Sequence, residues 1–370
     1  MMQTKLAKDL GLEIPLFAFT RSPEVVLEVS RAGGMGVLGA INLSAEELDE
    51  ALQFIDERID GKPYGVDTVM PMNYAGRGQE VTEEALRAMI SPAHHEFVAD
   101  LLKKHGVGEL PADFQRAGED LLGWSVERGK EHVEVSLKYP IKLIANALGT
   151  PPPEVVDQAH AHGVKVAALC GKVKQAIRHK EAGLDIIVAQ GTEAGGHTGE
   201  VAGMVLTPEV VDAVGDTPVL HAGGIGTGRQ MAAALALGAQ GVWTGSIWLT
   251  TAEHQSYNPE VVNEKLLAAK STDTVRSRAI SGKPARQLRT AWTEAWESAD
   301  SPGFLPIPLM WMVQAEAVER IYHHGNKELA GAPVGQIVGR MNEVRPVAEV
   351  IETMVRECRE RMAYLGGLAE

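Results

Sequence analysis

Short apolar runs alternate with helical patterns along most of the first 250 residues. The runs at residues 184–189 and 218–221 are too short for helices and too apolar for edge strands, which is typical of buried parallel strands. Ser22 and Pro23 suit the first positions of a helix, and Ser44 with Glu47 forms a capping box. In total, the pattern predicts eight strands, at residues 14–19, 35–40, 64–70, 141–145, 164–169, 184–189, 218–221 and 241–244.

Eight strands alternating with helices favour a (β/α)₈ TIM barrel over a doubly wound sheet. The rhythm breaks twice. Residues 71–138 are polar and helical in character, and we interpret them as an excursion over the barrel mouth. Residues 253–340 are irregular and rich in prolines, so we predict an inserted, mostly helical cap subdomain there. Residues 347–362 have one apolar helical face, which predicts a barrel domain of residues 1–252 and 341–370.

The loops after the predicted strands at 184–189, 218–221 and 241–244 are the main candidates for a binding site. Gly223 and Gly224 permit positive φ and a close approach of backbone N–H groups to a ligand. A helix pattern begins at Arg229, and its N-terminus would attract an anion. Gly245 and Ser246 form a second small-residue turn, so the two turns together predict the phosphate site usual in such barrels.

This glycine pattern has two alternative interpretations. A dinucleotide fingerprint does not fit, because residues 224–228 lack the G-x-G-x-x-G spacing and no acidic residue ends the following strand. The glycines could also do no more than form tight turns.

Composition limits the class of protein. The 370-residue chain is 45% hydrophobic and carries a net charge of −14, so an extended nucleic-acid surface is not expected. No apolar run approaches the ~20 residues of a membrane span, and the N-terminus is no signal peptide, which predicts a cytoplasmic protein. Cys170 and Cys358 are too far apart for a zinc site, and the histidine spacings predict no metal site either. We interpret Cys170 as a buried, inert thiol.

Four segments resemble the nitronate monooxygenase family, formerly called 2-nitropropane dioxygenases. They are IPLFAF with RAGGMGVLGA within residues 14–40, VAQGTEAGGHTG at 188–199, HAGGIGTGRQMAAALALGAQGVWTGS at 221–246, and SGKPARQLR at 281–289. The two glycine loops are also similar to those of flavin-dependent enoyl-acyl-carrier-protein reductases and flavin NAD(P)H:quinone reductases. The resemblance therefore implies a flavin enzyme more firmly than it implies a substrate.

The resemblance implies FMN at the carboxyl ends of the strands and His197 as the catalytic residue. The expected cofactor contacts are Gly223, Gly224, Gly245 and Ser246 at the phosphate, Gln190 at the ribityl chain or ring edge, Ala18 and Phe19 against the ring, and Gly195 and Gly196 leaving room beside it. An imidazole titrating near neutrality could take the α-proton of a nitroalkane. The alternative for His197 is a solvated loop histidine.

Asp67 and Lys172 are two of the positions that depart from the family pattern. Asp67 stands where many members carry Asn, and an anion there would be unfavourable near a reduced flavin. Lys172 stands where many have Ser or Thr; it either stabilises the reduced flavin or faces solvent.

Three functions remain open at this stage. The leading one is FMN-dependent oxidation of nitronates by O₂, with a small-molecule substrate, no nucleic-acid or membrane partner and a homodimer left open. The alternatives are an NAD(P)H-dependent FMN reductase of a quinone or enoyl thioester, and a binding or regulatory barrel without turnover.

Overall fold

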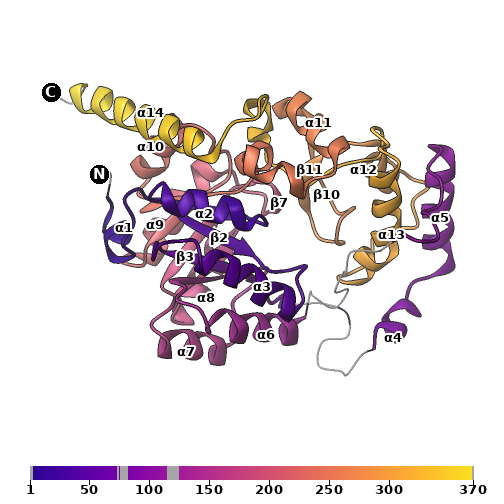
Figure 1. Ribbon diagram of the computed structural model, residues 1–370, viewed down its shortest axis with the longest axis horizontal. Helices are drawn as coiled ribbons and strands as arrows, with labels where there is room; N and C mark the ends of the chain where they lie inside the picture. Colours follow the sequence, from indigo (N-terminus) through magenta and orange to yellow (C-terminus); the bar gives the residue numbers. More distant parts are fainter. Residues whose placement is uncertain (1–2, 73–74, 76–81, 115–124, 369–370) are drawn as a thin grey trace.

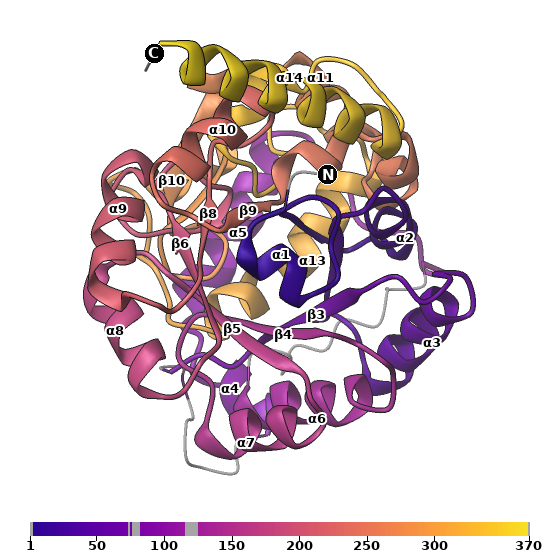
Figure 2. The same cartoon turned by 90° about the vertical axis from the view of Figure 1, so that its left-hand side faces the viewer.

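The computed structural model describes residues 3–72, 75, 82–114 and 125–368, and its centre is a closed barrel of eight parallel strands. The strand order is β1-β2-β3-β4-β5-β6-β8-β9, and β9 pairs with β1 to close the barrel (Figure 2). All eight predicted strands are present, with small differences at their ends. They are β1 (Leu16–Thr20), β2 (Met35–Gly39), β3 (Tyr64–Val69), β4 (Leu143–Ala147), β5 (Lys165–Cys170), β6 (Ile186–Gln190), β8 (Val219–Ala222) and β9 (Gly241–Thr244).

Helices between successive strands form the outer layer. The Ser22 side chain caps α2 by accepting a hydrogen bond from the Val25 N–H, and Ser44 and Glu47 form the predicted capping box of α3. The helix α14 returns at the end of the chain to pack against α10 and α2 (Figure 2). The outer helices are α2 (Pro23–Arg31), α3 (Ala45–Asp56), α6 (Val126–Ser136), α7 (Pro153–Ala161), α8 (Val173–Glu181), α9 (Gly203–Val214), α10 (Gly228–Ala236) and α14 (Val347–Gly367), while the short α1 (Lys5–Asp9) precedes the first strand.

Alternation along the strands divides the core into layers. Phe17, Val37 and Trp243 point into the barrel, where they form one apolar cluster with α1. Their strand neighbours point outward and pack under the helices. The interior of the barrel is therefore filled with side chains.

The second unit is a cap over the carboxyl ends of the strands, on the right in Figure 1. It has its own apolar cluster, built around Trp292, Trp296 and Met310. Three antiparallel strands run through it in the order β10-β11-β7, where β7 spans Gly196–His197. Its elements are β10 (Thr274–Ser277), β11 (Ala285–Leu288), α11 (Glu260–Ala268), α12 (Ala291–Trp296) and α13 (Leu309–His323), joined by the 3₁₀ turns η1 (Ser246–Thr250), η2 (Ala252–Tyr257), η3 (Ser271–Asp273) and η4 (Gln336–Arg340).

The excursion at residues 71–138 serves both units. The short α4 (Glu83–Arg87) and α5 (Pro92–Lys104) contact α13 and join the cap, whereas α6 packs against α3 and β3 as a barrel helix. The remaining parts of the excursion, residues 73–74, 76–81 and 115–124, lie outside the described residues. The predicted boundaries therefore miss α5, which belongs with the cap, and the three-stranded sheet, because β7 (Gly196–His197) reaches across from the barrel to pair with β11.

Candidate active site

A cavity of about 890 Å³ lies between the carboxyl ends of the barrel strands and the cap. Its size is at the upper end of the roughly 300–1,000 Å³ typical of ligand pockets. The barrel contributes the loops after its strands, and the cap contributes apolar side chains that include Trp292, Val318 and Ile321. Parallel strands end at one edge of a barrel, so loops far apart in sequence meet here.

The loop after β8 forms a cradle for an anion. Gly223 has a φ of 105° and Gly224 a φ of 69°, which are conformations that favour glycine. Among the described residues, no protein atom accepts a hydrogen bond from the N–H of Gly224 or Ile225. A Cβ on Gly223 would lie 3.1 Å from the Cβ of Ala194, so a side chain would fill this space. The Thr227 side chain then caps α10. These features fit a phosphate group.

Gly245 and Ser246 line the same cavity beside this loop. The Ser246 Oγ accepts a hydrogen bond from the Gly335 N–H at 2.9 Å, which fixes its position and leaves its own proton to be donated. Gly335 belongs to the segment that leads into η4, so the cap helps to hold the second predicted phosphate turn. The two turns come together as the sequence predicts.

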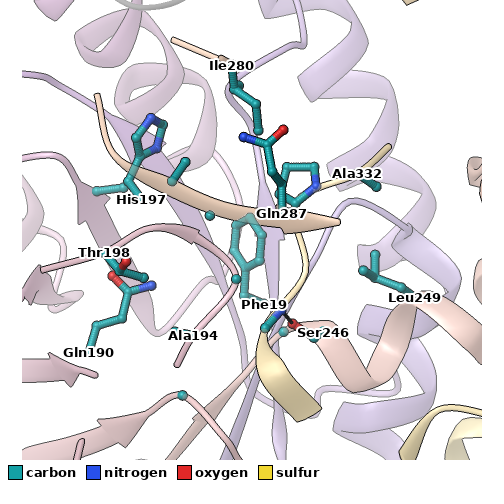
Figure 3. Close-up of a pocket in the computed structure, with 18 of the residues that line it drawn as sticks. Phe19, Gln190, Ala194, His197, Thr198, Ser246, Leu249, Ile280, Gln287 and Ala332 are labelled. Carbon is teal, nitrogen blue, oxygen red and sulfur yellow. Dashed lines mark hydrogen bonds between the residues drawn. The ribbon is translucent and has the colours of Figure 1, made fainter. Parts of the chain in front are cut away.

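Phe19 and Gln190 form walls of the cavity. In Figure 3, Phe19 lies between Gln190 and His197 on the left and Leu249 and Ala332 on the right. Ala18 differs, because it points outward from β1 into the apolar cluster under α2 and α10. Alternation along a strand puts neighbouring residues on opposite faces. The structure therefore does not bring the Ala18 side chain to the cavity.

Gly195 and Gly196 also line the cavity, and a different structural requirement favours glycine at each position. A Cβ on Gly195 would come within 2.8 Å of the backbone nitrogen of Gly335, so a small residue is required for packing against the cap. Gly196 has open space around it, and its φ of 74° is the reason for glycine there.

His197 lies on β7 and lines the cavity, opposite Ala285 of β11. Its Nε2 is 2.6 Å from the Oγ of Ser281, a fully buried residue of the cap. Burial, and then the positive charge of Lys283, lower the pKa of His197 to about 4. The imidazole is therefore neutral at neutral pH, which is the form that accepts a proton.

Two further polar groups face the cavity. The Oγ1 of Thr198 and the Nε2 of Gln287 are buried, and within the described chain neither has a hydrogen-bond partner (Figure 3). Buried polar atoms without partners are uncommon in folded proteins, so these two atoms point to a ligand. The segments that carry the family resemblance contain Thr198, Ser281 and Gln287, but no local pattern assigns these residues a role, because only the fold brings residues 281–289 to His197.

The two departures from the family pattern also lie at the cavity. Asp67 is buried in its wall, and desolvation raises the pKa of Asp67 well above its usual value. Burial therefore favours the protonated, uncharged form of this carboxyl group, which lessens the expected conflict with a reduced flavin. Lys172 is exposed at the mouth, and its contact with a flavin stays a prediction.

The described residues also bear on the expectations about metal sites, Cys170 and membrane spans. These residues include no group of three His, Cys, Asp or Glu side chains placed to hold a metal ion. Burial raises the pKa of the Cys170 thiol to about 12, consistent with its interpretation as an inert side chain. No helix among the described residues is both long and apolar enough to cross a membrane.

Comparison with known proteins decides the family. The family model described as "Nitronate monooxygenase" matches residues 14–357, which include the barrel, the cap and all the site residues above. The chain belongs to the nitronate monooxygenase family. This is a family of flavin-dependent oxidoreductases.

Three relatives illustrate the range of this similarity. A protein of Mycobacterium tuberculosis, Rv1533, whose description as a monooxygenase is provisional, is 48% identical over the whole of both chains. FabK from Thermotoga maritima is 26% identical with a TM-score of 0.74, again over the whole of both chains. Nitroalkane oxidase from Streptomyces ansochromogenes has a TM-score of 0.79 at 23% identity, covering 97% of this chain and 99% of that one, which supports the fold alone.

Proposed function

We propose that this protein oxidises nitronates, and nitroalkanes after deprotonation, with FMN and O₂, giving a carbonyl compound and nitrite. The observation that carries the proposal is the neutral His197 at a cavity that is also lined by a phosphate cradle of glycines. The family membership supports the reaction class, and the site chemistry supports a proton-accepting step.

FMN fits this cavity through a small number of contacts. The N–H groups of Gly224 and Ile225 and the Ser246 hydroxyl would hold its phosphate, and Phe19 and Gln190 would lie against its ring system. The chemistry that bound FMN supplies is the acceptance of electrons from the nitronate and their transfer to O₂.

His197 supplies the proton chemistry. Its neutral imidazole takes the α-proton of a nitroalkane, and Ser281 holds the ring in place through the 2.6 Å hydrogen bond to Nε2. Apolar side chains of the cap, including Trp292, Val318 and Ile321, surround the rest of the substrate and exclude water. This lining favours a substrate with a bulky apolar group.

The second candidate is an NAD(P)H-dependent FMN reductase acting on an enoyl thioester or a quinone. The similarity to FabK over the whole chain is the observation that favours it. The two candidates differ in their electron donor. Rapid anaerobic bleaching of the flavin by NADPH, with no bleaching by a nitronate, would favour the reductase.

The proposal is tested by the absorbance spectrum of purified protein, an anaerobic titration with a nitronate, and one substitution. The variant His197→Ala should keep FMN bound but lose about 10²-fold or more in turnover of neutral nitroalkanes, because general base catalysis contributes that much. The matched control is His95→Ala, an exposed histidine of α5. Unchanged turnover in His197→Ala would remove its role as the base.

The cellular location and the oligomeric state of the protein remain proposals. We place the protein in the cytoplasm, since Cys170 and Cys358 are both free and buried. A homodimer stays a prediction.

A further inference from the structure

A second cavity of about 250 Å³ opens beside the main one, and its walls are basic. Arg178 of α8 and Lys283 of the cap line it, together with Gln175 and Thr150. No aspartate or glutamate among the described residues lines this cavity. Two cations around one small space are unusual in a chain whose net charge is −14.

These two cations have no acidic partner among the described residues. Within the described residues, the Arg178 guanidinium donates one hydrogen bond, to the Met72 sulfur at 3.4 Å. Lys283 forms no ion pair with any of these residues, although it is partly buried and desolvation lowers its pKa. A partly buried ammonium group without a counter-ion is costly, and a bound anion would remove that cost.

The neutral groups of this cavity also favour an anion. The Oε1 of Gln175 accepts a hydrogen bond from the Gly171 N–H, which leaves the Nε2 of Gln175 to donate. His179 adds no charge, because burial lowers its pKa and its two ring nitrogens already contact Thr150 and the Leu169 carbonyl. The helix α8 begins here with no side-chain cap, so the positive end of its dipole adds to the attraction.

This site is separate from the phosphate cradle. In the closed barrel, β4 lies across from β9, and the second cavity is formed by the segments that follow β4 and β5 (Figure 2). An FMN phosphate held after β8 and β9 therefore cannot fill it. Lys283 lines both cavities and is two residues from Ser281, which contacts His197. A molecule anchored by Lys283 would extend toward the reactive end of the main cavity.

We propose that the second cavity binds the phosphate or diphosphate group of a second ligand, whose remaining part reaches the main cavity. Arg178 and Lys283 pair with the anion, and Gln175 donates a hydrogen bond to it. The inference does not depend on nitronate oxidation, because binding is measured without turnover. The proposal would therefore survive the failure of the proposed reaction.

The test is calorimetric titration of the protein, in the presence of excess FMN, with inorganic phosphate, inorganic pyrophosphate and ADP. We expect pyrophosphate and ADP to bind, with affinity that falls as salt rises. The variants Arg178→Gln and Lys283→Gln should each weaken binding by about tenfold or more. The control Lys142→Gln removes an exposed charge at the far end of β4 and should change nothing.

The outcomes separate the sources of the anion. Tighter binding of ADP than of pyrophosphate would support a nucleotide diphosphate, and equal binding would support a free inorganic anion or a simple phosphate ester. The proposal is overturned if none of the three binds to the FMN-saturated protein. It is also overturned if Arg178→Gln and Lys283→Gln bind as tightly as the unchanged protein, or if Lys142→Gln weakens binding equally. Arg178 is exposed, so its variant should fold.

Discussion

His197 and Lys283 are coupled through charge, although they are 86 positions apart in the chain. Burial lowers the pKa of His197 first, and the positive charge of Lys283 lowers it further, to about 4. Lys283→Met keeps most of the apolar stem and removes the charge. The pKa of His197 should then rise toward its usual value, so the base should become protonated at a higher pH than in the unchanged protein.

The measurement is the pH dependence of kcat/KM, whose acidic limb reports the free enzyme's base. We expect this limb to move to higher pH in Lys283→Met and to stay in place in Lys142→Met, which removes an exposed lysine far from the mouth. An acidic limb that does not move would mean that the lysine charge does not reach the imidazole.

Asp67 gives a prediction about stability. Desolvation raises its pKa in the folded protein well above the value of about 3.9 in an unfolded chain. Between those two values the folded state binds the extra proton, so stability falls as pH rises through this window. Asp67→Asn is uncharged throughout and lacks this fall. It should therefore unfold at higher urea than the unchanged protein at pH 8, by about 1.4 kcal/mol for each unit of raised pKa.

The difference should disappear below about pH 3, where Asp67 is protonated in both the folded and the unfolded state. Asp157→Asn, an exposed aspartate of α7, is the control and should show no such convergence. If Asp67→Asn were less stable than the unchanged protein at pH 8, the Asp67 carboxyl group would be ionised and paired with another group in the folded protein. Its pKa would then not be raised.

The sequence could predict only part of this site. Gly223, Gly224, Gly245 and His197 follow strands in glycine-rich loops, and such loops meet at one end of any barrel. Ser281 could not be predicted in the same way, because its contact with His197 depends on how the cap folds back over the barrel. The raised pKa of Asp67 depends on burial, which the local sequence pattern does not give.

Among the elements, α10 and α14 make a contact that depends on one glycine. A Cβ on Gly228 would overlap the carbonyl oxygen of Met354 and the backbone nitrogen of Cys358. Backbone atoms cannot move aside as a flexible side chain would, so Gly228→Ala should separate the two helices. We expect a loss of about 1–3 kcal/mol in the free energy of unfolding, the usual cost of overpacking.

Urea unfolding checks this, with Gly366→Ala as the control in the same helix pair. Gly366 lies near the end of α14, and a Cβ there would meet no atom within 4 Å. The control should be neutral or slightly stabilised, because alanine favours helix more than glycine does. Equal stability of both variants would mean that the α10–α14 contact adjusts without cost.

Some helices and strands could be predicted from local sequence patterns, and others could not. The barrel strands were predictable because each is a local apolar run followed by a helix with its own capping residues. The strand β7 was not, since it has only two residues and its partner β11 begins 88 positions further on. The sequence pattern places the helix α5 in the excursion, yet Leu101 and Leu102 pack into the cap cluster, a long-range contact with no local signature.

For the molecule as a whole, barrel closure is completed by the end of the chain. The chain returns from the cap as α14. Together with α2 and α10, this helix covers β1 and β9, the two strands whose pairing closes the barrel. Its buried face consists of Val347, Val350, Ile351, Met354 and Cys358. The apolar side chains of the first four contribute roughly 6–12 kcal/mol by burial. This is comparable with the entire stability of a typical domain, about 5–15 kcal/mol.

Removing residues 345–370 should therefore prevent folding, because it exposes the apolar cluster beneath α2 and α10. Removing residues 363–370 should leave a folded protein with a nearly unchanged melting temperature, since this end of α14 extends beyond the barrel (Figure 1) and Tyr364, Leu365 and Leu368 are 44–66% exposed. Circular dichroism and size-exclusion chromatography of both truncations check the pair. A folded, monodisperse protein ending at residue 344 would show that the barrel closes without its last helix, and that the predicted domain of residues 1–252 and 341–370 is wrong at its second segment.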